Sequence, residues 1–204
     1  MPTPPPLVIF GAVEGIVDEA VLRCLLVHAH LTAGSVYGKN GKTFLRRNLD
    51  RYNEAARHFP WVVLVDLNHD AACAPDLRVS WLPNPARRMC FRVAVREIEA
   101  WLLADRESLA CFLGVALSKV PHNPESLEDP KRTMIDLARC SRRREIREDM
   151  IPRPGSGRNV GPAYTSRIIE FVTDPHLSWK PDVAAKYADS LNRCLRSLAR
   201  FVES

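Results

Sequence analysis

The first half of the chain alternates short apolar runs with segments of helical spacing. Three runs rich in β-branched residues are typical of buried strands, and they cover residues 7–13, 61–65 and 89–95. A shorter strand is predicted at 35–37, where helix-breaking glycines flank Ser-Val-Tyr. Apolar positions three and four residues apart predict helices over 18–30, 43–59 and 96–105.

This alternation of strand and helix indicates parallel βαβ units. The expected fold is therefore α/β, with a mostly parallel, Rossmann-like sheet flanked by helices. The stretch between Asp66 and Met89 is rich in proline and reads as irregular.

The second half is helical in pattern and interrupted by prolines. Helices are predicted over 131–150, 162–172 and 182–202, and a flexible loop is predicted at Gly155–Gly157. We expect an α/β core over 1–105 and a helical extension over 106–204 that packs on it, the two forming one compact domain.

Composition places the chain among ordinary globular proteins of 204 residues. Its six cysteines include no C-x-x-C pair, which disfavours zinc; they suggest a reducing compartment, and most read as small core residues. The start, MPTPPP, has no basic region and no long apolar run, so it is not expected to be a signal peptide. No stretch reaches the roughly 18 apolar residues of a membrane span. The expected location is the cytoplasm, with no membrane partner.

The formal charge of +5 is concentrated in places. Arg142, Arg143 and Arg144 form a cluster suited to nucleic-acid phosphates, although a solvated helix face balanced by nearby acids stays open. Lys39 and Lys42, in GKNGKT, are predicted to contact phosphates near the site described next. A P-loop needs glycine where Val36 stands, so a nucleotide hydrolase is disfavoured.

Acidic and amide side chains follow three of the predicted strands. Parallel strands bring their carboxyl ends to one crevice, where ligands of open α/β sheets bind. Oxygen ligands without Cys or His favour Mg²⁺, with Mn²⁺ second. The candidate ligands and catalytic residues are Glu14, Asp66, Asn68, Asp70, Glu97 and Glu99.

Each acid alone also fits a helix cap or a first-turn residue stabilised by the helix dipole. On a helix, Glu97 and Glu99 would point about 200° apart and could not share one metal. On an extended segment both could face it.

The segment VEGIVDEAVLRCLL resembles the glutamate motif that opens a TOPRIM domain, and WVVLVDLNHD resembles its Asp-x-Asp motif. REIEAWLLAD, with YGKNGKTFL upstream, is similar to small bacterial TOPRIM-like proteins of unknown function, related to OLD-family nucleases and RloB-type defence proteins. The resemblance implies Glu14 as general base or ligand, Asp66 as main ligand, and an acid from Glu97 or Glu99. Asn68 replaces the second aspartate of the motif, which removes one negative charge.

Two classes of function follow. The first is a Mg²⁺- or Mn²⁺-dependent nuclease acting on DNA or RNA, with a role in bacterial defence against phage. The second is a non-catalytic nucleic-acid-binding protein or a regulatory partner of an ATPase encoded nearby. A homodimer is compatible with either.

Overall fold

The computed structural model describes residues 7–175 and 179–202. The start of the chain, MPTPPP, on which the absence of a signal peptide was predicted, lies outside them. The chain divides into two compact units: the first consists of residues 1–95 and 193–204, and the second of residues 96–192. Each is described by itself.

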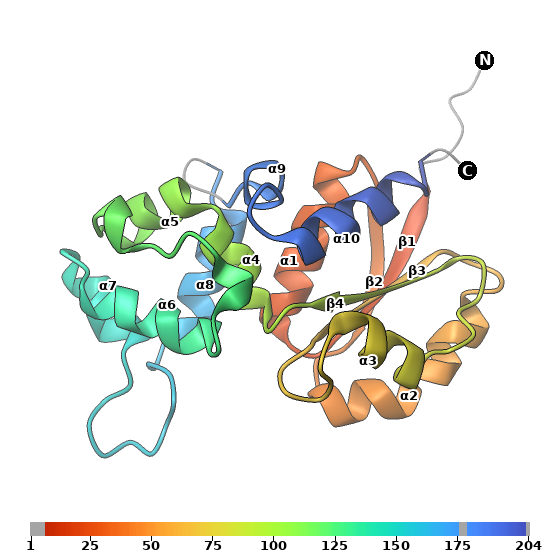
Figure 1. The fold of residues 1–204 in the computed structure, drawn as a ribbon, viewed down its shortest axis with the longest axis horizontal. Coiled ribbons are helices and arrows are strands. Elements are labelled where there is room, and N and C mark those ends of the chain that lie inside the picture. The colour runs from red at the N-terminus through yellow and green to blue at the C-terminus, as the bar shows by residue number, and fades with distance from the viewer. Residues whose placement is uncertain (1–6, 176–178, 203–204) are drawn as a thin grey trace. The chain divides into compact units, whose positions relative to one another are not determined.

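The first unit is built on a parallel sheet of four strands in the order β2-β1-β3-β4. The strands are β1 (Val8–Val13), β2 (Thr32–Gly38), β3 (Trp61–Asp66) and β4 (Met89–Ala94) (Figure 1). The predicted α/β class and the parallel sheet are confirmed. The strand at 35–37 is longer than predicted and pairs along β1.

Helices cover both faces of this sheet. Figure 1 shows α1 (Ile16–His28) on one face, and α2 (Lys42–Ala55) and α3 (Ala74–Trp81) on the other. The prediction that the stretch before β4 is irregular was wrong over α3. Pro75 lies in the first turn of α3, where a missing N–H costs no helical hydrogen bond.

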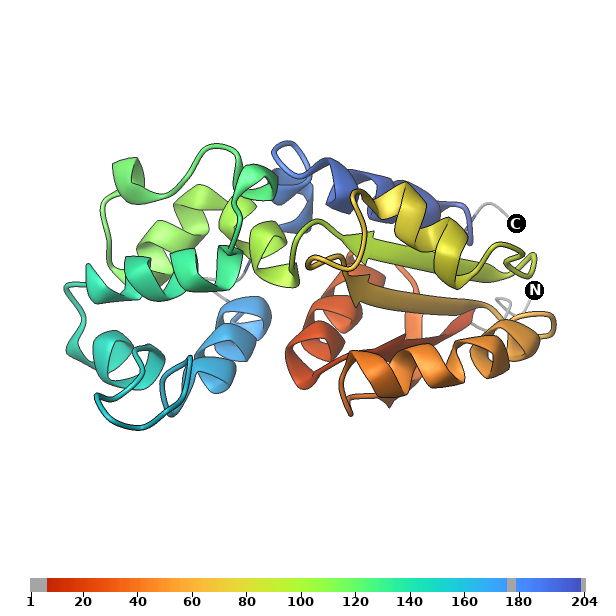
Figure 2. The ribbon, with the colours of Figure 1, turned by 60° about the horizontal axis from the view of Figure 1, so that its bottom comes forward.

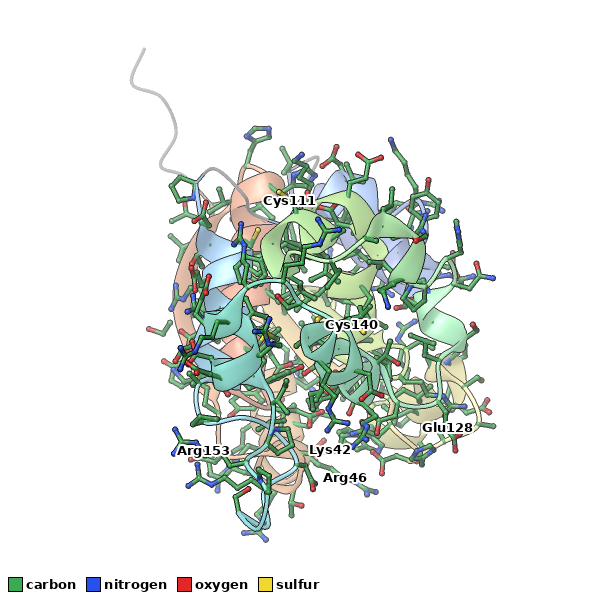
Figure 3. The ribbon with its side chains drawn as sticks, turned by 90° about the vertical axis from the view of Figure 1, so that its left-hand side faces the viewer. Lys42, Arg46, Cys111, Glu128, Cys140 and Arg153 are labelled. Atoms are coloured by element: carbon green, nitrogen blue, oxygen red, sulfur yellow. The ribbon has the colours of Figure 1, made fainter. Side chains whose placement is uncertain are left out.

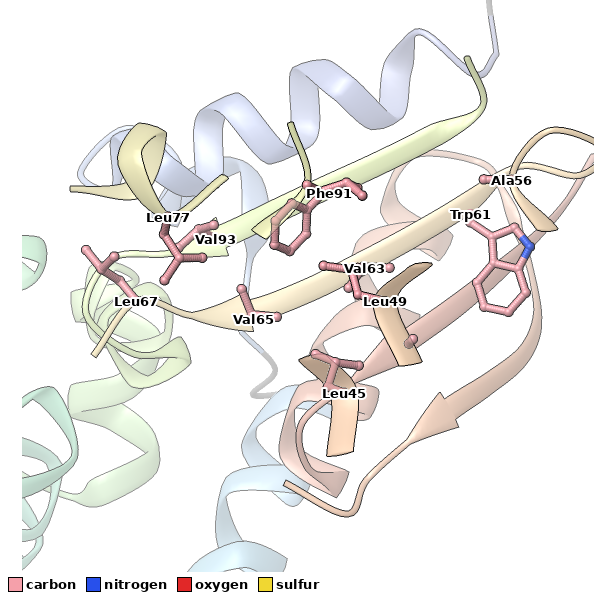
Figure 4. Packing of buried hydrophobic residues seen from close by; sticks show 12 residues of the cluster. Leu45, Leu49, Ala56, Trp61, Val63, Val65, Leu67, Leu77, Phe91 and Val93 are labelled. Atoms are coloured by element: carbon pink, nitrogen blue, oxygen red, sulfur yellow. The ribbon is translucent and has the colours of Figure 1, made fainter. Parts of the chain in front are cut away.

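A buried apolar cluster holds α2 and α3 on the sheet (Figure 4). Leu45 and Leu49 of α2 and Leu77 of α3 belong to it. They share it with the alternate residues of β3 and β4 that face these helices, namely Val63, Val65, Phe91 and Val93. The packing of α2 and α3 on the sheet therefore positions the start of α2 relative to β3.

Gly38 ends β2 beside Val13, the last residue of β1. Its φ of 89° is in the left-handed region, and a Cβ built there would collide with the Val13 carbonyl oxygen. We expect Gly38→Ala to lower the free energy of unfolding by about 3 kcal/mol or more, because the strained backbone and the clash add up. Chemical denaturation measures this loss.

Gly41→Ala is the matched control. Gly41 has a similar φ of 81°, but no atom lies within 4 Å of a Cβ built there. Only the backbone strain remains, so the expected loss is about 1 kcal/mol. Equal losses in the two variants would contradict the clash at Gly38.

The second unit is helical. Its elements are α4 (Ile98–Ala104), α5 (Arg106–Leu113), η1 (Leu117–Lys119), η2 (Pro124–Ser126), α6 (Pro130–Arg139), α7 (Arg144–Met150), α8 (Tyr164–Thr173) and α9 (Pro181–Ala184). The last helix, α10 (Asp189–Ala199), begins in this unit, while its residues from Arg193 onward belong to the first. No described helix has the length and apolarity needed to cross a membrane.

Two of the long helices that we predicted are each divided in two. The segment 131–150 breaks between α6 and α7, where the Ser141 hydroxyl accepts the Arg143 N–H at 2.9 Å. Such side-chain bonds compete with the helical ladder. The segment 182–202 breaks between α9 and α10.

Trp101 of α4 is fully buried in the second unit. Its Nε1 donates to the Ser190 hydroxyl at 2.7 Å, and its carbonyl accepts from Trp179 Nε1 at 3.0 Å. The side chain and the main chain of Trp101 therefore each tie α4 to a distant segment of the chain.

The prediction that most cysteines are core residues was wrong. Only Cys90 and Cys194 are buried, whereas Cys111 and Cys140 (labelled in Figure 3) are exposed. Apolar side chains fill the core without the other four.

Candidate functional site

The acidic residues that follow β1 and β3 meet at one place. These strands are neighbours in the sheet. Because β2 lies on one side of β1 and β3 on the other, the strand order reverses here, and the carboxyl ends of β1 and β3 form a switch point. The Asp66 N–H donates to Glu14 Oε1 at 2.8 Å. The Glu14 side chain and the Asp66 main chain, far apart in the sequence, therefore meet at one half-buried position.

The ammonium of Lys42 lies among the oxygens of this site. Its Nζ donates to the Asp66 carbonyl at 2.6 Å and to the carboxylate of Asp70. Glu14 Oε1 is 3.9 Å from the same nitrogen. Lys42 is the first residue of α2, so the helix start positions a cation between two strand ends.

The loop after β3 returns Asp70 toward α2. Asn68 has a φ of 48°, a left-handed conformation that asparagine tolerates better than most residues. The Asp70 N–H bonds to the Leu67 carbonyl at 3.2 Å, which closes the turn. The local chemistry of Asn68 thus helps to bring the Asp70 carboxylate to Lys42.

The loop between β2 and α2 is tied to the end of β1. The Lys39 N–H donates to the Val13 carbonyl at 2.9 Å, and the Gly41 N–H donates to the Glu14 carbonyl at 2.9 Å. The Lys39 side chain pairs with Glu19 of α1 at 2.9 Å. Burial alone would raise the pKa of Glu19, but Lys39 and Arg23 hold it below its ordinary value. Of the two predicted phosphate-contacting lysines, only Lys42 lies in the site.

An aromatic ring and a second cation lie beside Lys42. The guanidinium of Arg46, one helical turn further along α2, is 5.1 Å from the centre of the Trp81 ring, and Lys42 Nζ is 6.0 Å from it. Both cations are labelled in Figure 3. Arg46 was not among the residues predicted from the sequence, although its i, i+4 spacing from Lys42 places both on one helix face.

Glu97 and Glu99 belong to the second unit, where both face Lys131. Glu97 caps α4 with an extended backbone, the conformation that lets it point the same way as Glu99. The Lys131 ammonium is 3.6 Å from Glu97 Oε1 and 3.4 Å from Glu99 Oε1. Glu97 Oε2 also accepts the Lys131 N–H at 3.1 Å.

The Glu99 side chain is almost fully buried, with 3% of its surface exposed. The Tyr164 hydroxyl donates to Glu99 Oε1 at 3.2 Å. Burial, together with the negative charge of Glu99, raises the pKa of Tyr164 well above its ordinary value. These contacts give the pair a clear stabilising role between α4, α6 and α8.

The contact between Tyr164 and Glu99 makes the free energy of unfolding fall at alkaline pH. A raised folded-state pKa of Tyr164 stabilises the fold fully below the unfolded value of about 10, and this contribution is lost as pH rises toward the folded value. Tyr164→Phe should lower the free energy of unfolding by about 1–3 kcal/mol at pH 7, because Glu99 loses a donor. Above pH 10 the variant should lose stability less steeply than the wild type.

Chemical denaturation between pH 7 and 11 measures both effects. Tyr187→Phe is the control, since Tyr187 is 53% exposed. Parallel pH profiles for wild type and Tyr164→Phe would contradict the assignment.

The arginine cluster that we predicted on one continuous helix lies at the break between α6 and α7. Arg143 donates to the Phe112 carbonyl at 3.2 Å, and Arg144 pairs with Glu148 at 2.7 Å. Arg142 is exposed. Two of the three guanidinium groups therefore make contacts within the second unit. The ion pair between Arg144 and Glu148 agrees with the alternative reading, a solvated helix face whose charge nearby acids balance.

Comparison of the chain with protein-family models, curated proteins and solved structures finds no match. Among the described residues, no three His, Cys, Asp or Glu side chains are grouped to hold a metal ion as they stand. The cation that meets the oxygens at the switch point is the Lys42 ammonium.

Proposed function

We propose that the protein is a metal-dependent nuclease of TOPRIM-like fold whose active site is the switch point of the sheet. The observation that carries the proposal is the contact of Glu14 with the start of the loop at Asp66, beside Lys42. It joins an acid from each of two neighbouring strand ends with a phosphate-binding type of cation. Carboxylates can bind a divalent ion that in turn binds a phosphodiester, and a neighbouring ammonium can bind a phosphate oxygen of the same phosphodiester.

The donor atoms fit such an ion in kind. Carboxylate and amide oxygens, with no Cys or His among them, are ligands for Mg²⁺ or Mn²⁺. The Asp66 carbonyl oxygen and Glu14 Oε1 already surround one positive charge, the Lys42 ammonium. Glu14 and Asp66 would hold the ion, with Asn68 and Asp70 in reach through the turn that follows.

Each residue would then have a distinct role in hydrolysis. When bound by Glu14 and Asp66, a divalent ion would supply polarisation of a phosphoryl oxygen and a lowered pKa of a water molecule. Glu14 would accept a proton from the water that attacks phosphorus. As the new bond from that water to phosphorus forms, the bond to the leaving oxygen would break, and the leaving oxygen would keep the electron pair and take a proton from solvent. Lys42, released from Asp70, binds a non-bridging phosphate oxygen, and Arg46 extends this cationic surface along α2.

The test is direct. The purified chain is incubated with single- and double-stranded DNA and RNA in Mg²⁺, in Mn²⁺ and in EDTA, and Mn²⁺ binding is measured by calorimetry. We expect metal-dependent cleavage of at least one substrate. Absence of both cleavage and Mn²⁺ binding would overturn the proposal.

One observation favours the alternative of a non-catalytic nucleic-acid-binding or regulatory protein. Lys42 already neutralises Asp70, so this part of the site is electrostatically satisfied without a metal. In that case nucleic acid would bind equally well in EDTA and would not be cleaved. A partner ATPase would be sought by co-purification.

A further inference from the structure

A basic cavity of about 530 Å³ lies in the first unit, at the opposite end of the strands from Glu14. Leu7 and Pro60, which directly precede β1 and β3, form part of its wall. The rest comes from α3, from β4, the edge strand of the sheet, with the two residues before it, and from the end of α10 with the two residues after it. Figure 2 shows these two helices next to β4.

Arginine dominates the lining. Five guanidinium groups contribute to it, those of Arg78, Arg87, Arg88, Arg92 and Arg200, and none of the described lining residues is acidic. Within the described part of the chain, no carboxylate lies within ion-pair distance of the first four. The cavity therefore carries a positive charge that these residues do not compensate.

Two features of these arginines are unfavourable without a bound anion. Burial, and then the charge of Arg92, lower the pKa of Arg78. Arg92 donates to the Ser197 hydroxyl, while its buried Nε has no hydrogen-bond partner among the described residues. Gathering like charges and leaving a buried donor unpaired both cost free energy, which a bound anion would offset.

We infer that this cavity binds the phosphate groups of a small phosphorylated ligand such as a nucleoside polyphosphate. Guanidinium forks match phosphate oxygens bidentately, and several of them suit a ligand with more than one phosphate. The volume lies in the range of roughly 300–1,000 Å³ that small-molecule pockets occupy. Apolar walls at Leu7, Pro60 and Phe201 would face the rest of the ligand.

The inference stands apart from the proposed nuclease, and its test excludes the metal site. Binding of pyrophosphate, ATP and a single-stranded DNA 12-mer is measured by calorimetry in EDTA. Arg78→Gln/Arg87→Gln removes two exposed guanidinium groups, and Arg153→Gln/Arg158→Gln, in an exposed loop, removes the same charge elsewhere. We expect pyrophosphate and ATP to bind the first variant at least about tenfold more weakly, and the control as tightly as the wild type does.

The arms distinguish the sources of the phosphate. Tighter binding of ATP than of pyrophosphate supports a nucleotide that uses the apolar walls. Loss of DNA binding in the pocket variant, with no binding of either small probe, overturns the small ligand in favour of a nucleic-acid backbone. Unchanged affinities in the pocket variant, or no binding of any probe, overturn the site itself.

A measurement on the wild type covers the case of a variant that fails to fold. Phenylglyoxal modifies accessible arginines, and mass spectrometry locates the products. Pyrophosphate should protect Arg78 and Arg87 at least about tenfold, as a ligand present at ten times its Kd would, and should leave Arg153 unprotected. Equal modification of all three with and without pyrophosphate contradicts the inference.

Discussion

Glu14→Gln should abolish metal-dependent cleavage of nucleic acid, with a fall in rate of about 10³-fold or more, equivalent to roughly 4 kcal/mol of transition-state stabilisation. The amide keeps an oxygen in the place of Oε1, so it can still accept the Asp66 N–H and preserve the local fold. What it removes is the negative charge that holds the ion and the base that takes the proton. Initial cleavage rates and Mn²⁺ calorimetry measure both losses.

Asp66→Asn provides an independent variant at the same site. The contacts of Asp66 with Glu14 and Lys42 use its main-chain N–H and carbonyl, so they do not depend on its carboxylate. We expect the same loss of cleavage, with these two main-chain contacts retained. Glu54→Gln, at an exposed pair with Arg57, is the control and should retain full activity. Wild-type rates in both Glu14→Gln and Asp66→Asn would place the chemistry elsewhere.

Trp101→Ala should destabilise the second unit by about 3–5 kcal/mol, the usual cost of replacing a buried tryptophan by alanine. The ring is fully buried, and its indole N–H donates to Ser190. Removal leaves both a void and a buried hydroxyl without its donor. Urea denaturation followed by circular dichroism measures the change.

Trp101→Phe separates the two contributions. Phenylalanine retains most of the apolar volume but has no N–H for Ser190, so we expect a loss of about 1–2 kcal/mol. Trp81→Phe, in the first unit, is the control for the change of chromophore. If Trp101→Ala were no worse than Trp101→Phe, packing would not be the main contribution of this residue.

Three of the four strands, β1, β3 and β4, could be predicted from the sequence because each is a short apolar run between turn residues, whereas β2 contains few apolar residues and was predicted only at 35–37. The α3 helix could not, because Ala, Cys and Pro75 give no periodic signal and its stability comes from packing Leu77 on the sheet. The break after α6 was missed for a similar reason. Neither glycine nor proline lies at this break. Instead, the Ser141 hydroxyl accepts the Arg143 N–H in place of a helical hydrogen bond.

The part of the candidate site that lies at the strand ends could be predicted from the sequence. Parallel strands made the meeting of Glu14 and Asp66 an expected result. The position of Lys42 depends on where α2 starts and on a left-handed turn at Asn68, neither of which a pattern reveals. The arginine cavity gave no local signal at all, because its members come from residue 78 to residue 200.

The return of residues 193–202 to the first unit sets an order for folding during synthesis. In the finished protein, Cys194 and Leu198 are buried and Ser197 bonds to Arg92 of β4. On the ribosome, these residues emerge only after the whole intervening unit has been made, a delay of roughly 5 to 20 s at ordinary elongation rates. Until then the nascent sheet lacks the helix that completes it, so the growing chain exposes one side of β4 to chaperones.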